Sequence, residues 1–443
     1  MRTFFILLLV FAMSEINGQS WQVVGQNSFS SGEAYDQCIA LDGETPYVAF
    51  MDREHEDKAT VMKFNGAGWE VVGEEGFTPG EANSISFEII SGTPYIAFSD
   101  DANEGKASVM KFNGTNWENV GPAGFSPASA DAVCMAFGNG TPYVAFEDGN
   151  NSKVTVMKLD GGSWSVVGNP GFSTGWMTNV IAIAVEGDTP YVAYRDYGAD
   201  YKASVMKFNG TSWELVGSAG FSAKTHDAYQ CLAVHNGTPY VASWNADYNA
   251  AVYKFNGTTW ETIGNPYVSA EQASYQSIKI TDSGMLYLAF SDWGNSKKAT
   301  VVKYDGENWN LVGEAASMGD ASYISIAISD NGTPYIAYRD NYNMRRTTVM
   351  KFVTVSGINE PILDEHLSIY PNPTSGMFKI DTKEMNLNSY SVEIIDMNGE
   401  MIYIKSECSQ SISTINLTDK PKGIYLLKIG DDLKKYTKLV VLK

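Results

Sequence analysis

The chain has 443 residues, of which 44% are hydrophobic, 12% aromatic and 19% charged, and its 31 Lys and Arg against 51 Asp and Glu give a formal net charge of −20. This length and apolar content predict two or three packed domains and exclude a disordered chain. The acidic balance argues against nucleic acid as a partner, because binding to phosphate backbones depends on basic side chains. Four Cys and a glycine pattern without a three-residue period exclude a disulfide scaffold and collagen.

Residues 1–19 have the features of a secretory signal peptide. Arg2 precedes an apolar run from Phe4 to Ala12, and small or polar residues follow. A positive start, a short apolar stretch and small residues are typical of such signals. The run is too short to span a bilayer, and no later stretch reaches the roughly 18 apolar residues that a spanning helix needs. We therefore expect export, cleavage between Ser14 and Gln19, and no membrane span.

Residues 20–353 contain three sequence markers that recur in the same order in seven units, although the second marker is degenerate at Met285–Phe290 and the third drifts somewhat. The markers are Trp-x-x-Val/Ile-Gly, Thr-Pro-Tyr-Val-Ala-Phe and Val-Met-Lys-Phe, and the first recurs every 47 to 49 residues. Repeats of this length indicate a modular architecture in which each unit packs on its neighbours. The tryptophans of the first marker are Trp21, Trp69, Trp117, Trp164, Trp213, Trp260 and Trp309.

Each unit reads as four short strands, placed in the first unit at about 36–41, 46–52, 58–64 and 69–72. Asn-Gly pairs separate many of the apolar runs, as at Asn65-Gly66 and Asn139-Gly140, and this pair is a strong hairpin signal. Four antiparallel strands per unit of about 48 residues predict a β-propeller blade. The sequence resembles seven-bladed β-propellers without matching one family, because the aspartate box of sialidase propellers and the kelch double glycine are both incomplete.

The phase of the repeat predicts how the ring closes. The chain enters the pattern at a fourth strand, Trp21–Gly25, and leaves it after a third strand, Val349–Phe352. The N-terminal strand should therefore complete the last blade, which removes an open sheet edge.

The C-terminal segment, 367–443, follows a linker at 354–366 and alternates apolar and polar residues as short strands do. These strands predict a small Ig-like β-sandwich. The segments Leu367-Ser-Ile-Tyr-Pro-Asn-Pro, Val392-Glu-Ile-Ile-Asp-Met-Asn-Gly and Lys422-Gly-Ile-Tyr, with the ending Lys438-Leu-Val-Val-Leu-Lys, resemble the type A C-terminal sorting domain of the type IX (Por) secretion system. The resemblance implies a Bacteroidetes bacterium, the type IX secretion machinery as partner, and a domain removed after export, with the cargo released or attached at the cell surface. An ordinary Ig-like accessory module is the alternative.

The Cys and Asp residues that recur at equivalent positions of the repeat are interpreted as structural. Cys38, Cys134 and Cys231 occupy equivalent first-strand positions in alternate units, too far apart for disulfides, and are expected to be free thiols. Cys408 is alone in the C-terminal segment. An Asp ends the second strand in six units, and we expect it to cap the following loop. A calcium site in these loops is the alternative, so the expected cofactor is none, with calcium open.

The predicted working face is the end of the propeller that carries the second-to-third loops. The tight Asn-Gly turns lie at the other end, whereas these loops and the connections between units diverge and carry aromatic residues. Aromatic faces beside carboxylates and amides suit sugar rings; the alternative is that the rings pack their own loops. The candidate ligand-binding residues are Trp176, Tyr197, Tyr201, Trp244, Tyr248, Trp293 and Tyr342.

These features favour a secreted or cell-surface recognition protein that binds a glycan or another surface macromolecule. The sequence contains no zinc-protease motif (His-Glu-x-x-His) and no phosphate-binding loop (Gly-x-x-x-x-Gly-Lys). A glycan-cleaving enzyme of sialidase or lyase type is the alternative, and would need arginines such as Arg53, Arg195 and Arg339 to converge with a Tyr–Glu pair. A structural subunit of a surface complex is the third possibility.

Overall fold

The computed structural model divides the chain into two compact units, which are described separately. One unit is Gln19–Val353, and the other holds Thr354–Lys443. Both consist of β-strands, with a few short 3₁₀ helices in the first. The described residues are 19–175, 180–224, 231–264, 268–354, 367–382, 390–396, 401–408, 412–430 and 435–443.

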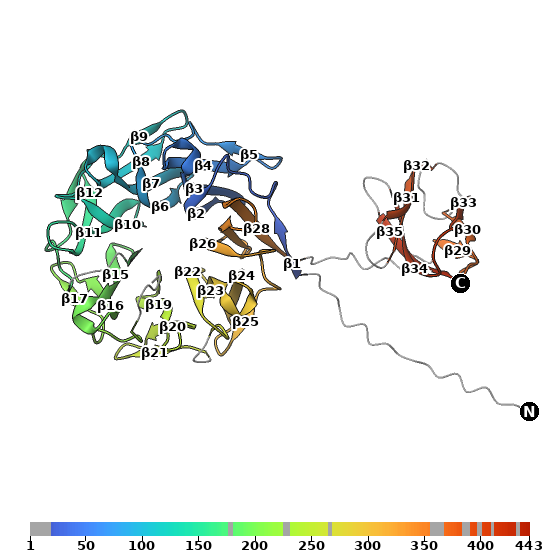
Figure 1. Cartoon of the computed structure of the whole chain (residues 1–443). Coiled ribbons are helices and arrows are strands. Elements are labelled where there is room, and N and C mark those ends of the chain that lie inside the picture. Colours follow the sequence, from blue (N-terminus) through green and yellow to red (C-terminus); the bar gives the residue numbers. More distant parts are fainter. Residues whose placement is uncertain are drawn as a thin grey trace, which may run out of the picture. The chain divides into compact units, whose positions relative to one another are not determined.

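The first unit is a ring of seven four-stranded antiparallel sheets, numbered here in chain order (Figure 1). The first three sheets are β2 (Ala34–Asp42), β3 (Thr45–Asp52), β4 (Lys58–Phe64) and β5 (Trp69–Val71); β6 (Ala82–Ile90), β7 (Thr93–Asp100), β8 (Lys106–Phe112) and β9 (Trp117–Asn119); and β10 (Ala130–Gly138), β11 (Thr141–Asp148), β12 (Lys153–Asp160) and β13 (Ser163–Val166). The next two are β14 (Ile181–Glu186), β15 (Thr189–Asp196), β16 (Lys202–Phe208) and β17 (Trp213–Leu215); and β18 (Cys231–His235), β19 (Thr238–Trp244), β20 (Ala250–Phe255) and β21 (Trp260–Thr262). The last two are β22 (Ala273–Ile280), β23 (Leu286–Asp292), β24 (Lys298–Tyr304) and β25 (Trp309–Leu311); and β26 (Ala321–Ile328), β27 (Pro334–Asp340), β28 (Arg346–Thr354) and β1 (Gln19–Val23).

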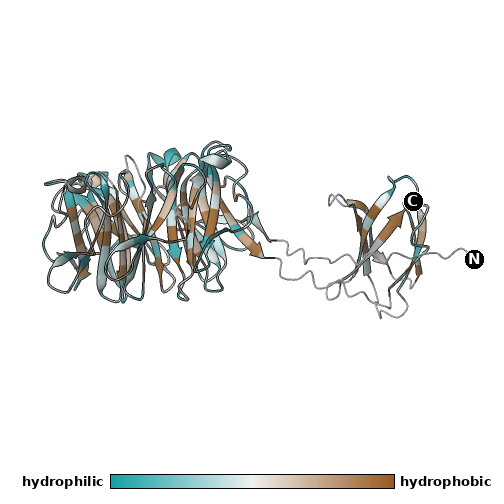
Figure 2. Ribbon diagram, turned by 90° about the horizontal axis from the view of Figure 1, so that it is seen from below, coloured by the Kyte–Doolittle hydropathy of each residue, from teal (hydrophilic) through white to brown (hydrophobic). Residues whose placement is uncertain are grey.

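The ring is continuous at the inner strands and at the seventh sheet. Each innermost strand contacts the innermost strands of the sheets on both sides, and β2 of the first sheet contacts β26 of the last. In the seventh sheet β1 lies beside β28, in the order β1-β28-β27-β26. The Val24 amide donates to the Val349 carbonyl at 2.9 Å, which continues this pairing. Seen from the side, the hydrophobic residues lie along the strands and hydrophilic residues at the two ends (Figure 2).

The repeated tryptophan links each sheet to the one before it. The indole N–H of Trp69 donates to the Val24 carbonyl at 2.8 Å, and that of Trp117 donates to the Val72 carbonyl at 2.8 Å. The same bond recurs around the ring, with Trp21 donating to Val312 at 2.8 Å. The glycine of the marker allows this approach: Gly73 has φ +83° and a Cβ there would lie 3.0 Å from the Trp117 ring.

The aspartate that ends the second strand caps the next loop, as predicted, in five of its six occurrences. Asp52 Oδ1, for example, accepts the Glu54 amide at 3.1 Å. Asp100 is the exception, because its carboxylate accepts from the Asn103 and Ser108 side chains and not from a backbone amide. The turn that follows is a 3₁₀ helix in four sheets: η1 (Arg53–His55), η2 (Asp101–Asn103), η3 (Tyr197–Ala199) and η4 (Trp293–Asn295). Bonds like that of Asp52 are made by Asp148, Asp196, Asp292 and Asp340, and by Asn245 in the fifth sheet.

In five of the sheets, a bulge near the start of the inner strand shifts the pairing by one residue. In the sixth sheet the pairing shifts between Ser274 and Ser277, and Tyr275 has φ +52°. In the seventh it shifts between Ser322 and Ser325, and Tyr323 has φ +49°. The first three sheets have the same shift in β2, β6 and β10. The bulges lie next to the ends of the second strands, where they place aromatic residues beside the candidate site.

The second unit contains two antiparallel sheets that share one hydrophobic core. Phe378 from one sheet and Val392 from the other are both buried in it. Asn398 and Gly399, at the end of the motif segment that begins at Val392, lie outside the described residues. No described segment of either unit forms a helix long and apolar enough to cross a membrane. The sheets are β29 (Ser368–Tyr370), β30 (Met377–Asp381) and β33 (Ile412–Asn416); and β32 (Met401–Cys408), β31 (Tyr390–Ile395), β34 (Gly423–Gly430) and β35 (Lys435–Leu442).

Candidate functional site

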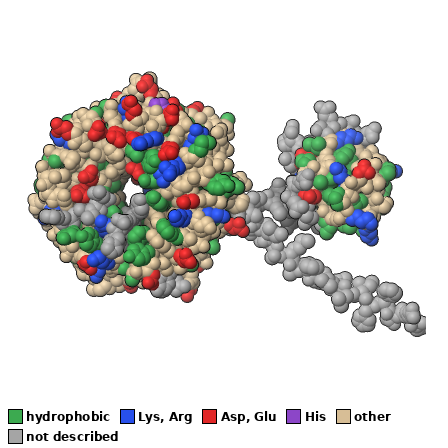
Figure 3. Space-filling view, in the orientation of Figure 1, with side chains coloured by type: hydrophobic (Ala, Val, Ile, Leu, Met, Phe, Trp, Pro, Cys, Tyr) green, Lys and Arg blue, Asp and Glu red, His purple; other side chains and the backbone are tan. Residues whose placement is uncertain are grey.

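A pocket of about 410 Å³ lies between the sixth and seventh sheets, at the end of the ring that carries the second-to-third loops. We call it the Trp293 pocket. Its walls come from the loop after β23, the start of β22 and β26, and the end of β27, so residues from separate repeats meet here. On the face seen in Figure 3, Lys and Arg side chains and hydrophobic side chains adjoin the central hollow. The pocket is lined by Trp244, Gln272, Ser274, Tyr275, Ser291, Trp293, Lys297, Asp320, Ser322, Arg339 and Asn341.

Trp293 is the main aromatic surface of the pocket. It is the first residue of η4, held in place because the carboxylate of Asp292 accepts the Gly294 amide at 3.1 Å. Its indole N–H donates to Ser274 Oγ at 3.1 Å, and the Lys297 ammonium lies 4.2 Å from the ring centroid. The side chain is 43% exposed. A large ring that is fixed by its polar edge and open on part of its surface suits stacking by a ligand.

Arg339, at the end of β27, is the best-anchored cation of the pocket. Its Nε donates to Ser322 Oγ at 2.9 Å and to Asn341 Oδ1 at 3.0 Å. Its guanidinium carbon lies 4.7 Å from the Tyr35 ring centroid and 4.8 Å from that of Tyr323. Two aromatic faces and two hydrogen bonds therefore fix the plane of the guanidinium group.

Carboxylates on both sides of Arg339 moderate the positive charge. Asp36 is half-buried in the first sheet; desolvation raises the pKa of this carboxyl, and the Ser84 backbone hydrogen bond and Arg339 partly oppose the shift. On the other side, Asn341 Nδ2 donates to Asp320 Oδ1 at 3.0 Å. With Lys297, Arg339 and Asp320 as its charged lining residues, the pocket has a net charge of +1.

The structure brings two of the predicted ligand-binding residues, Trp244 and Trp293, into the same pocket. Tyr342 is 80% exposed and follows the pocket residue Asn341. Tyr197 and Tyr201 belong to the fourth sheet, where their rings pack edge to face with centroids 5.0 Å apart. Trp176 lies outside the described residues.

Trp244 differs from the expectation of an open binding surface. It is only 6% exposed, and its indole N–H donates to the Ala273 carbonyl of the next sheet. Tyr248, which is 41% exposed, packs edge to face against it with ring centroids 5.4 Å apart.

The three arginines considered for a catalytic cluster have separate partners. Arg53 pairs with Asp57 in its own loop, and Arg195 lies 5.6 Å from the Tyr201 ring centroid in the fourth sheet. Only Arg339 lines the Trp293 pocket. Sequence reasoning weighed Arg339 as a catalytic residue but missed Tyr275, Lys297 and Asp320 as its neighbours. Their common signal is position, since each lies within a few residues of the start or end of a strand at this end of the ring.

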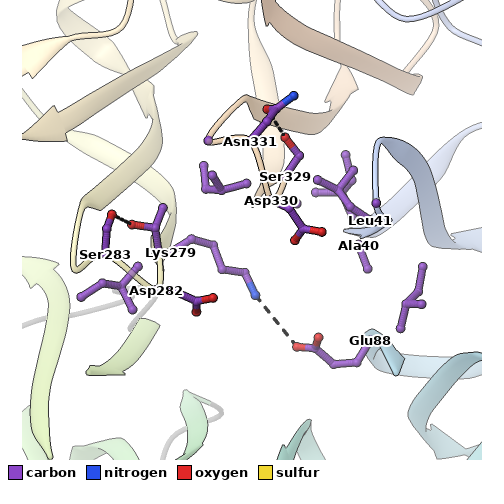
Figure 4. Close-up of a pocket in the computed structure, with 17 residues that line it drawn as sticks. Ala40, Leu41, Glu88, Lys279, Asp282, Ser283, Ser329, Asp330 and Asn331 are labelled. Atoms are coloured by element: carbon purple, nitrogen blue, oxygen red, sulfur yellow. Dashed lines mark hydrogen bonds and ion pairs between the residues drawn. The ribbon is translucent and has the colours of Figure 1, made fainter. Parts of the chain in front are cut away.

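A second pocket, of about 540 Å³, lies at the opposite end of the central channel (Figure 4). Lys279 and Glu88 point toward each other there, with Nζ and Oε1 3.9 Å apart. Asp282 and Asp330 also line it, which gives a net charge of −2, and its lining includes no aromatic residue. It lacks a ring on which a sugar could stack, so the Trp293 pocket is the stronger candidate.

Metal chemistry has little support in the described part of the chain, where no group of three or more His, Cys, Asp or Glu residues is placed to hold an ion. Cys38, Cys134, Cys231 and Cys408 are free thiols. Burial raises the pKa of the Cys38, Cys134 and Cys231 thiols to about 12, so these groups remain protonated at neutral pH. His55 contacts Asp52, with Nδ1 2.9 Å from Oδ2, in its own loop.

Comparison with protein families identifies the second unit. Residues 368–443 match the secretion system C-terminal sorting domain. This segment is a sorting domain of the type IX (Por) system. It marks the chain for export to the cell surface or the medium, which agrees with the expectation from its Tyr-Pro-Asn-Pro and Gly-Ile-Tyr motifs. No curated protein shows significant similarity to the chain.

Several solved structures are similar to the chain. An ulvan lyase, described as a polysaccharide lyase, aligns with a TM-score of 0.50 and 13% identity, covering 76% of this chain and 96% of its own. A fucose-recognising lectin of Aleuria aurantia, described as a six-bladed propeller, aligns with a TM-score of 0.45 and 14% identity, covering 67% of this chain and 99% of its own. A protein of Arthrobotrys oligospora aligns with a TM-score of 0.45 and 12% identity, with coverages of 68% and 91%. At 13% identity the likeness to the ulvan lyase concerns the fold alone.

Proposed function

We propose that this protein is an exported recognition protein that binds a glycan in the Trp293 pocket without cleaving it. In this proposal residues 1–19 are a signal peptide and residues 20–353 form a seven-bladed propeller that β1 closes. Residues 354–366 are a linker, and the Ig-like sorting domain is removed after export from a Bacteroidetes cell.

The observation that carries the proposal is the combination of a fixed, half-open Trp293 ring with polar groups at its edge. Sugars present C–H faces that stack on aromatic rings and hydroxyls that need hydrogen-bond partners. Asp320 and Asn341 supply acceptors and donors on the other wall of the pocket. A volume of about 410 Å³ has room for one or two sugar rings.

A glycan array with the full chain tests the proposal. We expect binding to a group of related glycans, and loss of that binding in Trp293→Ala. Binding to proteins of a surface extract but to no glycan would favour the structural-subunit reading and overturn the proposal.

A specific contact also favours the second candidate, a glycan-cleaving enzyme. The Tyr35 hydroxyl donates to Glu33 Oε2 at 2.8 Å, and Arg339 lies over the Tyr35 ring. A tyrosine paired with a carboxylate beside an arginine could act in acid–base or nucleophilic steps on a glycan. Release of reducing ends from the bound glycans, abolished by Tyr35→Phe and not by Tyr197→Phe, would support cleavage. Stable binding without new reducing ends would support recognition alone.

A further inference from the structure

We infer that the glycan held in the Trp293 pocket is anionic, carrying carboxylate or sulfate groups that Arg339 and Lys297 bind. This inference rests on the proposed function, because it names the class of ligand for the same pocket.

Among the described residues, Lys297 and Arg339 form no ion pair, whereas several other Lys residues of the propeller do. On the outer strands, Lys63 pairs with Glu70 at 3.2 Å, and Lys207 pairs with Glu214 at 3.3 Å. The contact of Lys297 is the Trp293 ring, and no ion pair among the described residues includes Lys297 or Arg339. In a chain with a net charge of −20, two cations without ion pairs at one pocket mark a place where negative charge is accepted.

The geometry of Arg339 also favours an anionic ligand. Both of its hydrogen bonds to the protein use Nε, and its ring contacts are with Tyr35 and Tyr323. The two terminal amino groups therefore form no hydrogen bond with any described residue. A planar guanidinium fixed on its Nε side presents these groups as a pair, which matches the two oxygens of a carboxylate or sulfate.

Most of the acidic groups near the two cations have other hydrogen-bond partners, so the cations remain available to an anionic ligand. Asp36 faces Arg339 from the first sheet, but it is half-buried and receives the Ser84 backbone hydrogen bond. Asp320 is engaged by Asn341 at 3.0 Å. On the η4 side, Asp292 caps its own loop and Glu271 lies next to Gly294. The pocket keeps a net charge of +1, in contrast to −2 at the opposite end of the channel.

The test compares matched charged and uncharged glycans on the full chain by isothermal titration calorimetry. The probes are an oligogalacturonide with its methyl ester, and a carrageenan oligosaccharide with its desulfated form, so that the two arms separate carboxylate from sulfate recognition. The variants are Arg339→Gln, Lys297→Gln and the charge-conserving Arg339→Lys. Lys279→Gln, at the opposite end of the channel, is the matched control. Thermal unfolding of each variant checks that it is folded.

We expect at least one acidic probe to bind about tenfold more tightly than its neutral form, because charge-assisted hydrogen bonds exceed neutral ones in strength. Arg339→Gln and Lys297→Gln should each remove about that factor, Arg339→Lys should lose less than Arg339→Gln, and Lys279→Gln should leave the affinity unchanged.

The outcomes separate the inference from the proposed function. One outcome is that charged and neutral probes bind equally, with that binding lost in Trp293→Ala and retained in the charge variants. This result would overturn the inference and keep the glycan site. Acidic binding that depends on Lys279 and not on Arg339 or Lys297 would also overturn it. An array on which neither acidic nor neutral glycans bind would overturn both.

Discussion

The indole nitrogen of Trp21 donates a 2.8 Å hydrogen bond to the backbone oxygen of Val312, 291 residues later in the chain. An equivalent bond joins each of the remaining adjacent pairs of sheets, for example from Trp309 to Ile263 at 3.0 Å. Trp21 also packs against Phe352 of β28, with ring centroids 5.3 Å apart. The first described strand of the propeller thus makes, in the last sheet, the contacts that each outer strand makes in its own.

Replacing Trp21 tests this relationship. Trp21→Phe removes the indole donor and leaves the Val312 carbonyl without it, which should cost about 1 to 3 kcal/mol of unfolding free energy. Trp117→Phe removes the equivalent bond within the ring and is the matched control. Guanidinium unfolding should show similar losses for both variants. If Trp21→Phe leaves the unfolding free energy unchanged while Trp117→Phe lowers it, β1 does not complete the seventh sheet.

The marker glycine should be far less replaceable than the turn glycine. Gly73 and Gly66 both have positive φ, so Ala adds backbone strain of about 1 to 2 kcal/mol at either position. A Cβ at Gly73 would also lie 3.0 Å from Trp117, whereas nothing lies within 4 Å at Gly66. We expect Gly73→Ala to lower the unfolding free energy by at least about 1 kcal/mol more than Gly66→Ala. Equal losses would show that the Trp–Gly contact is looser than described.

The inner-strand thiols predict a decline in stability at alkaline pH. Burial raises the pKa of Cys38, Cys134 and Cys231 from 9.0 to about 12 in the folded protein. Unfolded thiols ionise from about pH 9, so the thiols' contribution to stability is complete below pH 9 and is lost as pH rises toward 12.

A triple Cys38→Ser, Cys134→Ser, Cys231→Ser variant is the control, because Ser86, Ser277 and Ser325 occupy this position in other sheets. Its unfolding midpoint should fall less steeply between pH 9 and pH 11. The native thiols should also react slowly with iodoacetamide at pH 8 and rapidly after unfolding. Fast labelling of the folded protein would contradict the burial.

Trp244 and Trp293 should respond differently to truncation. Trp244 is 6% exposed and bonded to Ala273, so Trp244→Ala should cost about 3 kcal/mol of stability. Trp293 is 43% exposed, and Trp293→Ala should change the unfolding midpoint little. Thermal unfolding of the two variants measures the difference. A stable Trp244→Ala would return that residue to the set of candidate binding residues.

The sequence was sufficient to predict the sheets, because the Trp, Tyr and Met-Lys markers repeat with their turns. The phase of these markers also predicted the pairing of the segment at Trp21 with that at Phe352. The pocket was harder to predict, since Tyr35 and Arg339 meet only because the first and last sheets are neighbours in the ring. Tyr275 and Tyr323 depend on bulges with positive φ, and neither residue type signals that conformation. The burial of Trp244 could not be predicted from its position at the end of β19 alone.

Glycan recognition at the Trp293 pocket is tested most directly by measuring one pair of variants against the strongest array ligand. Trp293 and Tyr197 are the first residues of η4 and η3, and both are exposed aromatic side chains in equivalent loops of different sheets. We expect Trp293→Ala to weaken binding at least about tenfold and Tyr197→Ala to leave it unchanged. Unchanged affinity in Trp293→Ala, or an equal loss in both variants, would contradict the assignment of this pocket as the binding site.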